Sequence, residues 1–338
     1  MNIIGAFNEG IRRVGRAPAI PAGVLVLTFL VTLPLGLTLG AMIQEHLGSS
    51  LAAQTAASGV NVDWWEEFAA QAQGVGTSFT PAIIGFGGVL SNLSAMLDNR
   101  SQTLVVACAG AAYVILWIFL AGGILDRYAR NRPLRAGGFF SRCGVFFFRF
   151  LRLAVPALLA YWLLYAFVHA WLFGTVYPWA TRDFTAERQA FAVRAFFYLV
   201  FGALLVACNV VFDYAKIRAV VEDRRSMIGA VVAAARFIAR HPGQTAGLYL
   251  LNGLVFLLVV ACYALVAPGA GGAGWSLWLG LLMTQVYLLA RLLVKLLFYA
   301  SQTALFQATM AHAEYVAAPL PAWPDSPAAE AMGGPPQA

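Results

Sequence analysis

Residues 227–242, with the sequence MIGAVVAAARFIARHP, decide the fold because their pattern occurs more than once in the chain. Moving this stretch back along the chain aligns it without a gap with residues 3–18, IIGAFNEGIRRVGRAP. A fainter copy covers residues 139–155. Each copy is a basic, partly apolar helix candidate that runs directly into a long apolar segment. The matching positions include Arg12 and Arg236, Arg16 and Arg240, Pro18 and Pro242, and Arg149 and Arg236.

The composition identifies the solvent of this protein. Hydrophobic residues make up 61% of the chain and charged residues 11%, against about 45–50% and about 25% in soluble domains. The net charge of +7 is carried almost entirely by arginine, since Lys216 and Lys295 are the only lysines. Because the arginines cluster beside apolar segments, they indicate a membrane surface with anionic lipid rather than a nucleic acid partner.

Six apolar segments reach the length of about 20 residues that a helix needs to cross a bilayer. The first is longer than the apolar core of a secretory signal, about 7–15 residues, so we expect it to be retained. The fold class is therefore an all-α polytopic membrane protein with a single membrane domain over residues 1–316. The expected spans are residues 20–43, 103–125, 153–173, 191–212, 244–266 and 275–298.

Charge predicts the orientation of the spans. The three basic segments share one face of the membrane only if two spans separate each from the next, which places both termini in the cytoplasm. Residues 44–102, acidic apart from Arg100, then form an extracytoplasmic loop. Within it, residues 79–97 carry large apolar side chains at helical spacing, which favours an amphipathic helix over a seventh span. The Pro- and Ala-rich tail, 317–338, is expected to be disordered.

The order of elements predicts three tandem two-span repeats, each made of a basic amphipathic interface helix, a span, an outer loop and a second span. Similar exits support this interpretation: Asp126-Arg-Tyr128-Ala129 ends one second span, Asp213-Tyr214-Ala215 ends the next, and Tyr299-Ala300 follows in the third. The alternative to a repeat is that the three segments are alike only because any basic helix that precedes a span has a similar composition.

Charged residues in or beside the spans are the candidate functional residues. Asp126 and Asp213 end two spans, while Arg291 and Lys295 lie four positions apart on one helix face. These four form either a charged cluster along a substrate or ion path, or a set of structural ion pairs and side chains reaching the inner headgroups. We expect Arg291 to pair with one of the two aspartates, with Asp213 favoured over Asp126. Six arginines are expected to contact anionic lipid: Arg12, Arg16, Arg149, Arg152, Arg236 and Arg240.

Motifs of catalysis are not found in the sequence. The four histidines and four cysteines form no zinc, thiol-redox, hydrolase or nucleotide-binding pattern. The sequence therefore predicts a protein without enzymatic activity, catalytic residues, cofactor or metal.

The run from Asp213 to Ser226, followed by Arg236-Phe237 and Arg240-His-Pro242, resembles bacterial six-span integral membrane proteins of unknown function. It is similar to the membrane domain that precedes glycerophosphodiester phosphodiesterases in some bacteria. No histidine here is followed by Arg-Gly, as that catalytic domain would need, so the resemblance implies a fold and a membrane rather than an activity. We expect a scaffold or accessory subunit of a bacterial inner membrane that contacts lipid, a membrane-protein partner or a second copy. The alternative is a transporter or lipid-handling protein.

Overall fold

The computed structural model describes residues 1–48, 50–80, 85–133, 135–269 and 274–312, and every element in these ranges is a helix. Short helices begin the chain and occupy the loop after the first span: α1 (Ile3–Gly15), α3 (Ala52–Ser58), α4 (Val62–Gln71), η1 (Gly74–Ser78) and α5 (Phe86–Leu97). The longer helices are α2 (Ala19–Leu47), α6 (Leu104–Arg130), α7 (Ala136–Leu163), α9 (Glu187–Val221), α11 (Pro242–Val266) and α12 (Trp275–His312). The π-helical turns η3 (Leu164–His169) and η4 (Leu172–Val176), then α8 (Tyr177–Thr181), extend α7, and α10 (Met227–Arg240) precedes α11.

Six helices are long and apolar enough to cross a membrane, which confirms a multi-pass, all-helical membrane protein. They are α2, α6, the continuous run from α7 to α8, α9, α11 and α12. Five of them contain an expected span whole, while α6 begins one residue after the start of the span expected at 103–125, and all six extend beyond their span on at least one side. The expected disordered tail, 317–338, lies outside the described residues, as do positions 81–84 of the expected helix 79–97, whose described part is α5.

The three basic segments join their spans in two different ways. The chain bends between α1 and α2 just before Pro18, and between α10 and α11 at His241 before Pro242. A residue that precedes proline is disfavoured in helical geometry, so these two prolines begin new helices. In the middle segment α7 continues past Pro156 as one helix. The basic segment and the first part of the span expected at 153–173 therefore form one continuous helix here. Packing on both sides of the proline, through Leu153 and Ala157, keeps the helix continuous.

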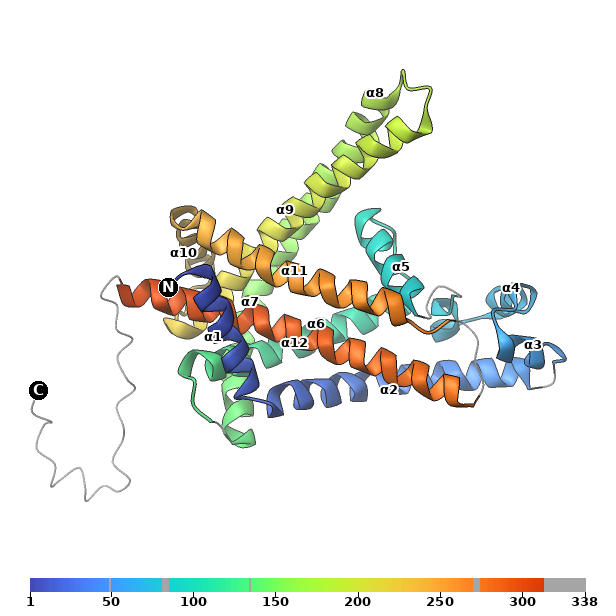
Figure 1. The fold of residues 1–338 in the computed structure, drawn as a ribbon, viewed down its shortest axis with the longest axis horizontal. Coiled ribbons are helices and arrows are strands. Elements are labelled where there is room, and N and C mark those ends of the chain that lie inside the picture. Colours follow the sequence, from blue (N-terminus) through green and yellow to red (C-terminus); the bar gives the residue numbers. More distant parts are fainter. Residues whose placement is uncertain (49, 81–84, 134, 270–273, 313–338) are drawn as a thin grey trace, which may run out of the picture.

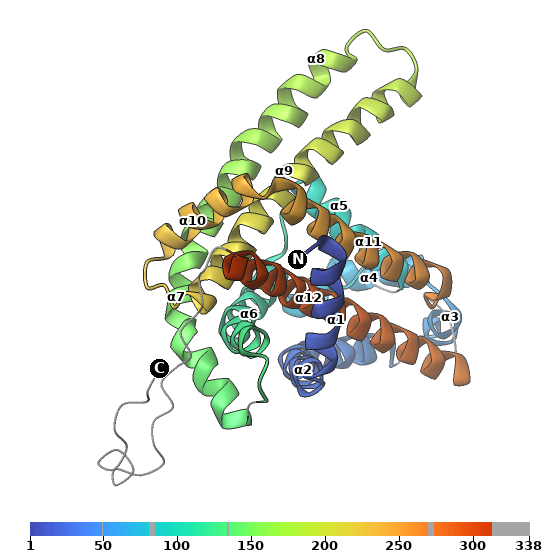
Figure 2. The same cartoon turned by 60° about the vertical axis from the view of Figure 1, so that its left-hand side comes forward.

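The hydrophobic core lies at one end of the molecule, which we call the basic end. It comprises α1, α10, the part of α7 up to Leu153, the first turns of α2 and α11, and the C-terminal parts of α6, α9 and α12. Toward the other end of the spans, which we call the distal halves, few side chains are buried. The hairpin formed by α7, α8 and α9 diverges there from α2, α6, α11 and α12 in both views (Figures 1 and 2). The spans are therefore held together mainly at the basic end.

Candidate functional site

The basic end is built from three span exits that pack on one another. Helices α6, α9 and α12 are mutually in contact there, and a basic helix covers each of them. Helix α7 packs on α6 and α10 packs on α9, each following its span in the chain, whereas α12 is covered by α1 from the start of the chain. The tyrosines of the three exits, Tyr128, Tyr214 and Tyr299, are all buried. Close approach is possible because glycines face the partner helix, as where Gly10 of α1 lies against the backbone of Ser301. This arrangement brings the charged ends of the spans into one packed region.

Asp126 is buried at the exit of α6 and is neutralised by arginines. Its carboxylate accepts a hydrogen bond from Arg130 at 2.9 Å and lies 3.8 Å from Arg142 of α7. The ion pair therefore links α6 to the following helix. Asp126 is thus paired with one arginine of its own helix and one of α7. In the described part of the chain, it forms no ion pair or hydrogen bond with Asp213, Arg291 or Lys295, the other members of the predicted cluster.

Asp213 forms its ion pair with a lysine of its own helix, α9. Lys216 donates to the Asp213 carboxylate at 2.6 Å, and Asn209 donates to it at 3.3 Å. The expected pair between Asp213 and Arg291 is not among the ion pairs of the described residues, and Arg291 is exposed. Lys216 is preferred because it lies one helical turn away and reaches the carboxylate without crossing between helices.

Lys295 lies in the same region but against aromatic rings instead of a carboxylate. Its ammonium is 3.4 Å from the ring centroid of Trp117 and 5.6 Å from that of Tyr113. Trp117 in turn contacts Tyr299, on whose ring Lys216 sits at 5.2 Å. The two lysines of the chain thus share one aromatic cluster with Asp213. Within the described ranges, no acceptor is found for the buried indole nitrogen of Trp117, and no salt bridge for Lys295.

Largely buried arginines that join helices of the basic end were missed by sequence reasoning. Arg13 of α1 donates to the Tyr128 carbonyl at 2.9 Å and to Gln307 at 2.8 Å, which joins α1 to α6 and α12. Arg218 of α9 donates to the Ala233 carbonyl of α10 at 2.6 Å. The burial of Arg13 could have been predicted from the sequence, because Arg13 lies on the same face of α1 as the small residues Ala6 and Gly10, which are buried.

The six arginines expected to meet lipid are not equivalent. Arg149 is largely buried and pairs with Asp223 at 2.5 Å, so its charge is used within the protein. The other five are exposed at the surface of the basic end: Arg12, Arg16, Arg152, Arg236 and Arg240.

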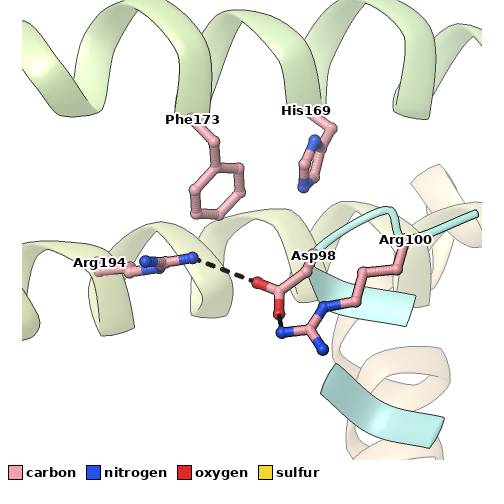
Figure 3. Close-up of a pocket in the computed structure, with 5 residues that line it drawn as sticks. All are labelled: Asp98, Arg100, His169, Phe173 and Arg194. Carbon is pink, nitrogen blue, oxygen red and sulfur yellow. Dashed lines mark hydrogen bonds and ion pairs between the residues drawn. The ribbon is translucent and has the colours of Figure 1, made fainter. Parts of the chain in front are cut away.

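A pocket of about 260 Å³ lies in the distal region, where the loop before α6 meets the hairpin (Figure 3). It is lined by Asp98, Arg100, His169, Phe173 and Arg194. Figure 3 shows the Asp98 carboxylate between the guanidinium groups of Arg100 and Arg194, with the rings of His169 and Phe173 facing it from α7's extension. We call this the Asp98 pocket. It was not predicted, because its residues come from three distant parts of the sequence.

Asp98 is the acceptor that joins the walls of this pocket. Tyr198 and Arg194 of α9 donate to one of its oxygens, while Ser94 and Arg100 donate to the other. The hydrogen bond from Tyr198, helped by Ser94 and the two arginines, holds the pKa of Asp98 below its ordinary value against the opposing effect of desolvation. The carboxylate therefore stays ionised and its acceptor capacity is already used.

The π-helical extension of α7 fixes the other side of the pocket. Tyr165 donates to the Met96 carbonyl at 3.1 Å, and the Nε2 atom of His169 lies 2.9 Å from the Leu97 carbonyl. Both acceptors belong to the last turn of α5, whose carbonyls have no partner within the helix. The π-helical turns aim these side chains at α5, a use often found for such turns.

In the described part of the chain, neither region contains a cluster of potential metal ligands. Across the described ranges, no three His, Cys, Asp or Glu side chains gather as metal ligands would. Comparison of the chain with protein-family models, with curated proteins and with solved structures finds no match. The geometry of the chain itself is therefore the basis for assigning a function.

Proposed function

We propose that this chain is a non-enzymatic integral membrane protein of a bacterial inner membrane that acts as a scaffold or accessory subunit. The observation that carries the proposal is the unequal burial along the spans. The packed basic end holds the helices together, whereas the distal halves present large apolar side chains, such as Phe167, 59% exposed, and Leu199, 73% exposed. A bilayer covers such side chains with lipid or with helices of another protein.

The proposed orientation places the basic end and both termini in the cytoplasm. It is supported by the arginines exposed there, since cytoplasmic segments beside spans carry an excess of basic residues. These arginines would hold the basic end on anionic headgroups at about 1 kcal/mol each. In a cysteine-free background, Ala70→Cys in α4 should react with an impermeant thiol reagent on intact cells, and Arg225→Cys should not. Labelling of Arg225→Cys in intact cells would reverse the orientation.

Three tandem two-span units, each opened by a basic amphipathic helix, are part of the proposal. Equivalent positions of α1 and α10 support it, because Ala6 and Ala230 are both buried, as are Gly10 and Ala234. The buried exit tyrosines of α6, α9 and α12 are also equivalent. Membership of the six-span proteins that resemble phosphodiesterase-associated membrane domains is likewise proposed, on the sequence motifs alone.

A partner helix or a second copy of the chain has a natural contact on α2. Gly36 and Gly40 are four positions apart, and the space beside each is open. Such a pair allows two helix backbones to approach closely. The test is Gly36→Leu, matched by Gly253→Leu, which also faces open space in α11. Native electrophoresis in mild detergent should show an associated species that the first variant loses and the second keeps. Equal behaviour of both variants would contradict a contact at α2.

The alternative, a transporter or lipid-handling protein, is favoured by Lys295 and Trp117. A lysine without a carboxylate in or beside a span is a candidate for binding an anionic group. A lipid-flip assay in reconstituted vesicles separates the two functions. Flipping above the level of protein-free vesicles that is lost in Lys295→Met would support lipid handling. Wild-type vesicles indistinguishable from protein-free ones would support the scaffold.

A further inference from the structure

The Asp98 pocket has more positive charge than its own contacts require. Two guanidinium groups flank a single carboxylate, so the pocket carries a net charge of +1. Asp98 already accepts from Tyr198, Ser94 and both arginines. It therefore has little capacity left to attract a cation, and the excess charge favours an anion.

The guanidinium groups of Arg100 and Arg194 keep N–H donors that no atom in the described part of the chain accepts. Each guanidinium has five N–H groups. Within the described residues, Arg194 uses its Nε toward Tyr198 and one Nη toward Asp98, and Arg100 uses one Nη toward Asp98. Both side chains are half-exposed or more, at 49% for Arg194 and 66% for Arg100. Two arginines with spare donors around one opening match the geometry of a tetrahedral oxyanion.

The position of the pocket in the bilayer selects the kind of anion. Arg194 precedes Asp213 on α9 by 19 residues, which is about 28 Å along the helix. This distance is close to the thickness of the hydrocarbon core, about 30 Å. The pocket therefore lies at the headgroup level of the leaflet opposite the basic end, where phosphate esters of lipids are the most abundant oxyanions. The rings of Phe173 and Tyr198, 4.9 Å apart, supply an apolar wall beside it.

We propose that the Asp98 pocket binds the phosphate group of a membrane phospholipid from the leaflet opposite the basic end, through Arg100 and Arg194. The site goes beyond the proposed scaffold function and does not depend on it. Arg100 and Arg194 donate to the phosphate oxygens, and Phe173 contacts the glycerol end of the lipid. Asp98 positions the two guanidinium groups and makes no contact with the phosphate.

The test is a lipid titration of the full chain in mild detergent, followed by native mass spectrometry, with dioleoylphosphatidylglycerol as the probe. Arg100→Gln removes one donor group while Tyr198, Ser94 and Arg194 still hold Asp98. It should weaken binding of the first lipid about tenfold, and the Arg100→Gln/Arg194→Gln double variant should weaken it further. Arg182→Gln is the matched control, because Arg182 is 65% exposed and has one carboxylate partner, Asp183, on the same side of the membrane. It should bind as the wild type does.

Two further measurements separate a ligand site from a purely structural contact. Tyr198→Phe loosens Asp98 but keeps both guanidinium groups, so it should retain binding to within a factor of about three. Dioleoylglycerol, which lacks the phosphate, should not compete. If inorganic phosphate displaces the lipid in an arginine-dependent manner, the phosphate site stands and a water-soluble source is assigned. The proposal is overturned if Arg100→Gln and Arg182→Gln bind equally, or if dioleoylglycerol competes as well as phosphatidylglycerol.

Discussion

The basic end and the distal halves of the spans contain the same kinds of residue but differ in what surrounds their apolar side chains: other protein side chains at the basic end, and the outside of the protein in the distal halves. At the basic end, buried polar side chains such as Asp126 and Thr303 have partners, and aromatic rings pack on one another as in a soluble core. In the distal halves of α7 and α9, large apolar side chains such as Trp162 and Phe191 face outward. We therefore expect side chains of the basic end to contribute most of the free energy of unfolding, because in the distal halves lipid replaces most side-chain contacts.

The largest expected difference between the two regions comes from removing a phenyl ring. Phe306 is fully buried at the basic end, where it contacts Phe237 and Arg218. Phe306→Ala should therefore lower the free energy of unfolding by about 3–5 kcal/mol. Phe196→Ala in α9, where the side chain is 59% exposed, should change it by less than about 0.5 kcal/mol. Thermal unfolding in detergent measures both, and equal losses would contradict the division into two regions.

A smaller effect is expected from adding a methyl group to α1. A Cβ at Gly10 would lie 2.9 Å from the backbone of Ser301, which cannot move aside, so Gly10→Ala should cost about 1–3 kcal/mol. Gly15 on the same helix meets no neighbour within 4 Å. Gly15→Ala should therefore cost nothing, or gain up to about 1 kcal/mol from reduced backbone entropy of the unfolded chain. Two losses of similar size in the unfolding midpoint would mean that α1 does not pack on α12 as described.

The smallest effect concerns pH and the Asp98 pocket. The folded protein lowers the pKa of Asp98. The ionised Asp98 carboxylate therefore stabilises the fold at pH values above the ordinary carboxyl pKa, and this stabilisation is lost as the pH falls through the lowered pKa. Wild type should exceed Asp98→Asn in stability by less than about 1 kcal/mol at neutral pH, and this difference should vanish in acid. Hydrogen exchange of the α5 amides across this range checks it. A difference that grows in acid would give the opposite sign and refute the described contacts.

Sequence alone predicted what depends on local composition. The length of apolar segments gave the six spans, and prolines at 18 and 242 marked two of the helix starts. The continuity of α7 through Pro156 was not predictable, because it depends on tertiary packing around Leu153. The partner of Asp213 was misassigned because the choice between Lys216 and Arg291 depends on which way each side chain faces. The Asp98 pocket joins residues about 100 positions apart, for which a single sequence holds no signal.

The measurement that tests the central claim most directly is labelling of the purified protein in lipid vesicles by an apolar, photoactivated carbene dissolved in the hydrocarbon phase. If the spans are held together at the basic end and lipid covers their distal halves, label should enter α7, its π-helical extension and α9 around Trp162, Phe167 and Leu199. It should spare the buried residues of the basic end, such as Phe150 and Tyr214. Label spread evenly along α7 and α9, or a distal hairpin protected from label, would contradict the account.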